Sequence, residues 1–230
     1  AVYFVSNFLK NKFLKGLKKN YDNLHVLYNS IERKHKFIPK KNNEICFIGR
    51  LVPEKGAHIY CAAIEEIAKD YTDWNFTLIG ASKAGQTIPK SIYEKNLINK
   101  FKSIGKNTHY LGFIDNESVQ KKISNASIVV IPSIWEEPLC LVAIEGLCNA
   151  AVVISSNKGG LPEVLDDNGI MLHDINKKTL KDKIIELLTN TKLIKKYQKK
   201  SWDNYKFNSS KNTKKQDLIR SQILINFNFK

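Results

Sequence analysis

Short, continuously apolar runs alternate with segments of helical periodicity from residue 44 onward, and this alternation constrains the fold more than any other feature. Strands that are apolar throughout, rather than at every second residue, are typical of a parallel sheet with both faces buried. We therefore predict an α/β fold, a Rossmann-like parallel sheet with helices on both faces. The predicted strands are 44–48, 74–79, 108–111, 127–131, 151–155 and 170–172, and the predicted helices between them include 57–69, 92–104 and 118–123.

The same pattern divides the chain into three parts. Residues 1–42 hold two short apolar strands, a helix that Ser6 can cap, and a basic stretch with Pro39 that is typical of a linker. Residues 43–205 carry the alternating strands and helices, and residues 206–230 are expected to form a helical tail. Because the sequence opens directly on a strand without an initiator Met, we expect a fragment in which residues 1–42 are the remnant of an N-terminal domain and its linker.

The formal net charge of +15 admits three kinds of partner: nucleic acid, an anionic membrane surface or a polyanionic substrate. Nucleic acid is disfavoured because the sequence lacks the clustered basic and aromatic motifs of nucleic-acid-binding modules. Lys, Asn and Ile are abundant together, which an AT-rich genome would also produce, so the charge by itself carries little weight. No apolar run approaches the roughly 18 residues of a membrane span, and no signal peptide opens the sequence, so we expect a cytoplasmic protein.

The four cysteines stand in apolar strand or helix contexts and lack the spacing of metal ligands. Such positions are typical of buried, reduced thiols. We therefore expect no metal site in this chain. The cysteines are Cys46, Cys61, Cys140 and Cys148.

Polar loops follow several of the predicted strands, and the carboxyl ends of parallel strands share one edge of the sheet, where ligands bind. The loop 49–56 places Arg50 and Lys55 between two glycines, and two such cations could grip a diphosphate. The paired glycines of the loop 156–163 offer N–H groups that could face a sugar or a phosphate. Each loop taken alone is more often an ordinary turn, so the prediction depends on finding the loops together.

The stretch 131–145 (IPSIWEEPLCLVAIE) predicts a strand end, a short acidic loop and a helix. We expect Pro138 to occupy the first helical position, where its missing N–H costs nothing, so that the loop ends at Glu137. Glu145 then lies two turns into the helix, roughly 12 Å along the axis from Glu137 and about the reach of a nucleotide diphosphate. Either carboxylate alone could be a surface residue, but Glu145 interrupts an apolar helix and needs a hydrogen-bond donor.

Three motifs, in this order, resemble the C-terminal half of retaining glycosyltransferase family 4, which has the GT-B fold. They are FIGRLVPEKG (47–56), PSIWEEPLCLVAIE (132–145) and NKGGLPEV (157–164). Glu137 and Glu145 match the family's pair of glutamates separated by seven residues. The loop LIGASKAGQ (78–86), with Cys140 where the family usually has Gly, further resembles lipopolysaccharide core hexosaminyltransferases.

This resemblance implies that 43–205 is a nucleotide-sugar-binding domain. The transferase would move a hexose or N-acetylhexosamine from a nucleotide diphosphate sugar, first of all a UDP-sugar, to lipopolysaccharide core or another surface glycolipid. Arg50 and Lys55 would bind the donor diphosphate and stabilise it as it departs, Glu137 would hold hydroxyls of the transferred sugar, and Glu145 would accept hydrogen bonds from the ribose. No metal or other cofactor is expected, because the cations replace it. The N–H groups expected to help with the phosphates are those of Leu139, Cys140 and Leu141.

Two other functions stay open at this point. A GT-B-fold sugar-nucleotide epimerase is disfavoured because the two cations and two glutamates match the transferase pattern, and a basic nucleic-acid-binding protein is favoured only by the net charge. The resemblance also puts the family's acceptor site in the N-terminal domain, which residues 1–42 barely include. We therefore expect this chain alone to bind donor weakly and to transfer no sugar. The whole protein would act on a glycolipid at the inner face of an anionic membrane, as a peripheral protein.

Overall fold

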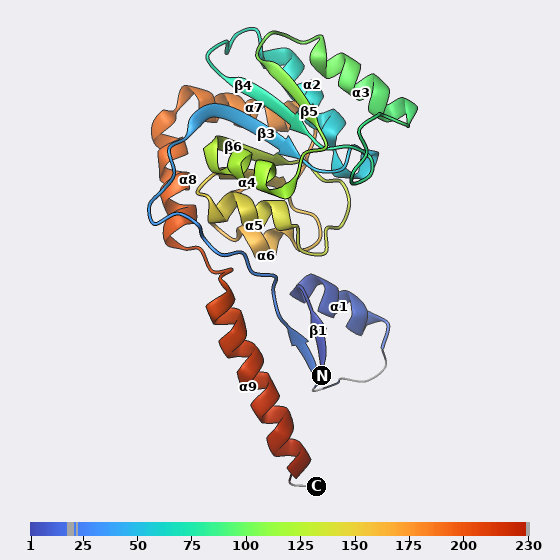
Figure 1. The fold of residues 1–230 in the computed structure, drawn as a ribbon, viewed down its shortest axis with the longest axis vertical. Coiled ribbons are helices and arrows are strands. Elements are labelled where there is room, and N and C mark those ends of the chain that lie inside the picture. Colours follow the sequence, from blue (N-terminus) through green and yellow to red (C-terminus); the bar gives the residue numbers. More distant parts are fainter. Residues whose placement is uncertain (18–20, 22, 229–230) are drawn as a thin grey trace.

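The computed structural model describes residues 1–17, 21 and 23–228 (Figure 1). Within them, one sheet has six parallel strands in the order β5-β4-β3-β6-β7-β8. The predicted α/β fold with a parallel sheet is thus confirmed, and the predicted strand boundaries differ from the observed ones by two residues at most. The strands are β3 (Asn42–Ile48), β4 (Asn75–Ile79), β5 (Thr108–Gly112), β6 (Ala126–Ile131), β7 (Val152–Ser156) and β8 (Ile170–Leu172).

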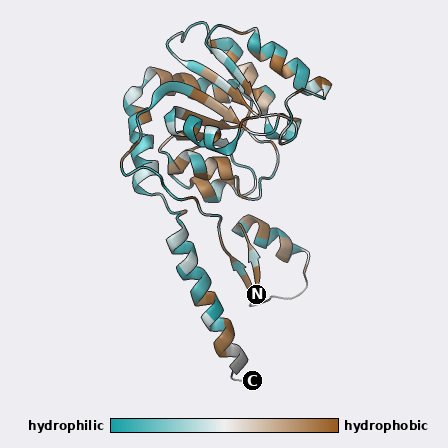
Figure 2. Ribbon diagram, in the orientation of Figure 1, coloured by the Kyte–Doolittle hydropathy of each residue, from teal (hydrophilic) through white to brown (hydrophobic). Residues whose placement is uncertain are grey.

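Helices cover both faces of this sheet, as the apolar strands require. Along β6, Ile128 and Val130 pack into one hydrophobic core, whereas Val129 and Ile131 pack into the other. One core is covered by α2 (Ala57–Ile67), α3 (Ile92–Lys102) and α7 (Lys177–Thr189), and the other by α4 (Asn116–Asn125), α5 (Leu141–Cys148) and α6 (Leu161–Leu165). α8 (Thr191–Asp203) packs against α5, α7 and β7. Figure 2 shows that α5 is mostly hydrophobic, whereas α4 is mostly hydrophilic.

The N-terminal residues form a small unit beside the six-stranded sheet. β1 (Val2–Phe4) and β2 (Leu24–Val26) pair in parallel, and α1 (Asn7–Lys15) lies between them in the chain. The Ser6 hydroxyl accepts a hydrogen bond from the Leu9 N–H, so Ser6 caps α1 as predicted. Residues 18–20 and 22 of the predicted N-terminal remnant lie outside the described residues.

The end of α8 returns to the segment that leads into β3. The Arg33 guanidinium stacks 3.7 Å from the centre of the Trp202 ring, and the Tyr205 hydroxyl donates to the Ile31 carbonyl over 2.7 Å. From there α9 (Ser209–Asn228) projects away from the sheet (Figure 1). It occupies the predicted tail, of which residues 229 and 230 lie outside the described part. No helix in the described ranges is long and apolar enough to cross a bilayer.

Candidate active site

The loop after β3 carries Lys55 to the end of β6. Residues Pro53–Lys55 form one 3-10 turn, which ends at Gly56 in a left-handed conformation with φ of 72°. A Cβ on Gly56 would overlap the Pro132 carbonyl, so only glycine allows this approach of the two loops. Leu51, which is fully buried, anchors the other end of the loop. The Lys55 side chain therefore reaches the loop that follows β6.

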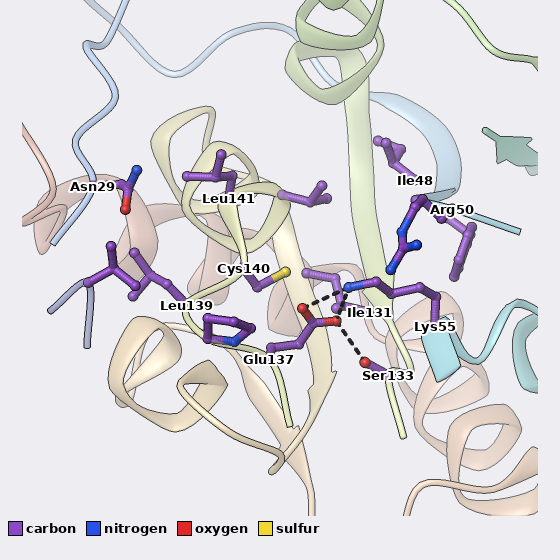
Figure 3. Close-up of a pocket in the computed structure, with 15 residues that line it drawn as sticks. Asn29, Ile48, Arg50, Lys55, Ile131, Ser133, Glu137, Leu139, Cys140 and Leu141 are labelled. Carbon is purple, nitrogen blue, oxygen red and sulfur yellow. Dashed lines mark hydrogen bonds and ion pairs between the residues drawn. The ribbon is translucent and has the colours of Figure 1, made fainter. Parts of the chain in front are cut away.

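The Lys55 ammonium and the Glu137 carboxylate form a close ion pair (Figure 3). Lys55 Nζ lies 2.6 Å from Oε1 and 2.8 Å from Oε2 of Glu137, and the Ser133 hydroxyl donates to Oε1 over 2.8 Å. Glu137 is only 4% exposed, whereas Lys55 is half-buried. A carboxylate this deeply buried needs such partners, because its desolvation is otherwise costly. Glu137 is thereby held in one orientation at the wall of a cavity.

This Glu137 cavity has a volume of about 460 Å³ and lies beyond the carboxyl ends of β3 and β6. Arg50 lies exposed in its lining, and Figure 3 shows its guanidinium on the side of the cavity from which Lys55 enters. Among the described residues, no carboxylate lies within ion-pair distance of Arg50. The structure thus brings Arg50, Lys55 and Glu137 together, with one cation open to an anion. Leu139, Cys140 and Leu141 also line this cavity.

The predicted start of α5 at Pro138 is wrong, because the helix begins at Leu141. The Gly160 N–H donates to the Glu137 carbonyl over 2.6 Å, and a Cβ on Gly159 would overlap the Glu137 backbone. This contact with the glycine loop fixes residues 137–140 in a non-helical path and overrides the preference of a Pro for the first helical position. The first-turn residues that line the cavity are accordingly Leu141 and Val142, and N–H groups at this position have no acceptor within the helix.

Cys140 directly precedes α5 and has a φ of 74°, a backbone conformation that favours glycine. An L residue there is strained by roughly 1–2 kcal/mol. Burial raises the pKa of its thiol to about 12. All four cysteines are free thiols, of which Cys140 is half-buried and the others are buried.

Glu145 does not join the other predicted site residues. It lies on the face of α5 that lines a second cavity of about 630 Å³, between α4, α5 and residues 30–35. Gln120 Nε2 donates to its Oε1 over 2.6 Å. Burial raises the pKa of the Glu145 carboxyl, and the hydrogen bond from Gln120 opposes this shift. The predicted helical spacing between Glu137 and Glu145 is wrong, because Glu137 precedes the helix and is held by the loop contacts above.

Residues 29–203 match the family model described as glycosyl transferases group 1. The chain belongs to this family. An uncharacterized glycosyltransferase of Methanocaldococcus jannaschii is 32% identical over 193 residues, which are 83% of this chain and 50% of that protein. A lipopolysaccharide 1,2-N-acetylglucosaminetransferase of Salmonella typhimurium is 26% identical over 172 residues, covering 70% of this chain and 45% of that protein. The chain thus spans about half the length of these curated relatives.

Solved structures agree with this group 1 assignment. HepE of Anabaena in complex with UDP superposes with a TM-score of 0.80 at 18% identity, over 96% of this chain and 63% of that one. The C-terminal domain of a group 1 glycosyltransferase of Francisella tularensis gives a TM-score of 0.61 at 27% identity, over 77% of this chain and 92% of that one. These neighbours are GT-B glycosyltransferases, so the sheet described here has the GT-B arrangement.

This group 1 glycosyltransferase has a third cavity that the sequence did not indicate. It measures about 190 Å³, shares Ile48, Gly49 and Arg50 with the Glu137 cavity, and is otherwise lined by small or apolar residues. Its lining follows β4 and β5, so the strand pattern alone could have located it, but no charged motif marks it. The further lining residues are Ile79, Gly80, Ala81, Ala84, Phe113, Ile114 and Val119.

Three residues of the candidate site were also not predicted. Ser133 holds Glu137, while Val5 and Asn29 of the N-terminal unit line the Glu137 cavity. Their positions depend on contacts between distant parts of the chain, which no local motif reports. In the described part of the chain, no group of three or more His, Cys, Asp or Glu side chains could hold a metal ion.

Proposed function

We propose that this chain is the donor-binding part of a retaining glycosyltransferase that takes a UDP-sugar and transfers a hexose or N-acetylhexosamine. One observation carries this proposal: a group 1 glycosyltransferase holds Arg50, Lys55 and Glu137 around one cavity at the carboxyl edge of its sheet. The complexes of the structural neighbour HepE with UDP and with UDP-glucose support the choice of donor.

The diphosphate would lie between Arg50, Lys55 and the start of α5. Negative charge develops on the diphosphate as the sugar leaves, and fixed cations stabilise charge where it develops. Arg50 has no competing carboxylate among the described residues, and Lys55 would be shared between Glu137 and a phosphate oxygen. The free N–H groups of Leu141 and Val142 would add the positive end of the helix dipole. In this arrangement no metal is required.

Glu137 would orient the transferred sugar through its hydroxyl groups. Both carboxylate oxygens face Lys55 and one also accepts from Ser133, so the group is rigid and already engaged. A carboxylate in this state is suited to accept further hydrogen bonds rather than to attack the anomeric carbon. Glu137 would then be a positioning group that touches the substrate, unlike the nucleophile of a retaining glycosidase.

The nucleoside would extend from the diphosphate toward the other two cavities. The flat base fits the chemistry of the small apolar cavity that begins at Arg50. The ribose hydroxyls would donate to Glu145, replacing the hydrogen bond from Gln120. This exchange keeps the half-buried carboxylate hydrogen-bonded before and after binding.

The acceptor is proposed to be a glycan on a lipid, such as lipopolysaccharide core, at the inner face of the membrane. The similarity to the Salmonella typhimurium lipopolysaccharide 1,2-N-acetylglucosaminetransferase supports this choice. The net charge of +15 would favour an anionic bilayer, by roughly 1 kcal/mol per well-placed cation near the surface.

A melting series tests the donor proposal. UDP and UDP-sugars, in the presence of a chelator, should stabilise the chain by about 2.7 kcal/mol at one hundred times the dissociation constant. GDP and ADP, with their sugars, show whether the base is read. Arg50→Ala should weaken UDP more than uridine, since only UDP carries the partner of the guanidinium. Absence of a shift with every nucleoside diphosphate would contradict the proposal.

A further inference from the structure

The Glu163 carboxylate, on α6, receives four hydrogen bonds from the N-terminal unit. Oε2 accepts from the Asn7 N–H over 2.8 Å, from the Asn7 side-chain amide over 3.0 Å and from the Tyr28 hydroxyl over 3.0 Å. Oε1 accepts from the Phe8 N–H over 2.5 Å. One side chain of the sheet domain thus contacts both α1 and the segment after β2.

These contacts satisfy groups that have no partner inside α1. The first N–H groups of a helix lack acceptors within it and carry the positive end of the helix dipole. Ser6, which is fully buried, takes the Leu9 N–H, and Glu163 takes those of Asn7 and Phe8. Burial and Glu163 together raise the pKa of Tyr28 to about 12, so its hydroxyl stays protonated and donates.

The same contacts reach the Glu137 cavity through both neighbouring segments. Val5 precedes the cap of α1 and Asn29 follows Tyr28, and both line the cavity. On the other side, Glu163 belongs to the short helix that follows Gly160, whose N–H holds the Glu137 carbonyl. Glu163 therefore connects the wall residues Val5 and Asn29 to Glu137, the residue proposed to hold the sugar.

We propose that Glu163 is a positioning residue that holds Val5 and Asn29 against the Glu137 cavity and so closes its wall over the donor sugar. The inference rests on the proposed function for its ligand, but the contact itself does not. The exposed Lys12 and Glu136 pair, 2.5 Å long, is a second contact between α1 and the same loops. Exposed pairs contribute little, so of these two polar contacts with α1 we expect Glu163 to matter more.

The test compares Glu163→Gln, Glu163→Asp and a matched control, Glu186→Gln. Glu186 pairs with Lys183 on the outer face of α7, so its variant makes the same chemical change away from the cavity. Hydrogen exchange of the ligand-free chain is read in peptides that cover residues 5–8 and 29. Glu163→Gln should speed exchange there about tenfold, with the sheet domain unchanged, whereas the control should match the wild type.

Calorimetry then separates a positioning role from a purely stabilising one. Glu163→Gln should weaken a UDP-sugar about three- to tenfold and change UDP alone by less than about twofold, because the proposal places this wall against the sugar. Glu163→Asp, which keeps the charge, should recover part of the loss. Equal losses for UDP and UDP-sugar, or unchanged exchange at residues 5–8, would overturn the inference.

Two further outcomes are kept distinct. If the wild type binds no nucleotide sugar, the proposed function fails, while the exchange comparison still decides whether Glu163 holds the N-terminal unit. If Glu163→Gln unfolds the whole chain, Tyr28→Phe takes its place, because it removes one of the four hydrogen bonds and keeps the ring that packs on Phe207. Tyr28→Phe should show the same changes in hydrogen exchange and in UDP-sugar binding, but smaller ones. Exchange equal to that of the wild type would overturn the inference.

Discussion

Glu137 and Glu145 lie on either side of the start of α5, and they meet opposite surroundings. Glu137 is 4% exposed and faces a cation and a hydroxyl. Glu145 faces one neutral amide, and burial raises the pKa of its carboxyl. A buried carboxylate with a cation is fixed in place, whereas one with a single amide can exchange that partner for ligand hydroxyls. The two environments therefore suit a positioning group and a ligand-exchange group.

The strongest way to break this contrast is to remove the cation. Lys55→Met leaves Glu137 buried without its charge partner and should lower the free energy of unfolding by about 2–4 kcal/mol, somewhat less than for a fully enclosed pair because Lys55 is half-buried. Urea unfolding measures the loss. Adding Glu137→Gln should recover most of it, since no buried charge remains. Lys183→Met, which breaks a surface pair with Glu186, is the control and should change stability by less than about 1 kcal/mol.

Ligand binding should also distinguish Glu137 from Glu145. Glu145→Gln should weaken UDP and UDP-sugar alike, by about 1.5–3 kcal/mol, because both carry the ribose that a charged acceptor would hold. Glu137→Gln should leave UDP nearly unchanged and reduce only the added affinity that the sugar confers. Calorimetry with the two ligands on each variant provides the four values. The reverse pattern would mean that the donor lies in the opposite direction along the site.

Cys140 lies between Glu137 and Glu145 in the chain, and relieving its backbone strain should change stability by a smaller amount. Cys140→Gly should exceed Cys140→Ala in stability by about 1 kcal/mol, because only glycine is at ease at φ of 74°. At an ordinary helical position the order is reversed. Thermal unfolding of the two variants checks the sign, and a more stable Ala variant would show that the backbone at Cys140 is not strained.

The pH dependence should be the smallest difference between the glutamates. Because the native pKa of Glu145 is raised, the folded chain binds more protons than the unfolded chain above the ordinary glutamate range. The contribution of Glu145 to stability is therefore full at low pH and is lost as the pH rises through its native pKa. Glu145→Gln should remove this decline in urea titrations between pH 4 and pH 8, whereas Glu186→Gln, at an exposed position, should retain it.

The sequence predicted the sheet because a parallel sheet leaves a direct trace in the chain. Each strand is apolar throughout, as in β6, where alternate residues enter both cores. It also predicted that Arg50, Lys55 and Glu137 follow strands, and the sheet edge brings them to one cavity. Charged residues that directly follow a strand can therefore be predicted from the strand pattern to lie together.

What the sequence did not predict depends on contacts between loops. The start of α5 is displaced from Pro138 to Leu141 by Gly159 and Gly160, a tertiary effect that local helix signals do not contain. The separation of Glu145 from Glu137 follows from that displacement. The small cavity near Phe113 was missed for another reason, since apolar residues lining a binding site have the same composition as a core.

The close approach of the glycine loops also limits how this site could be engineered. Gly56, Gly159 and Gly160 place backbone directly on backbone, so the loops that hold Lys55 and Glu137 have no space for an added methyl group. Substitutions or insertions there would displace the charged pair itself. Val5, Asn29 and Leu141 also line the cavity, and none of them contacts these glycines in this way. Libraries aimed at a new donor sugar should vary those three positions and keep the glycines unchanged.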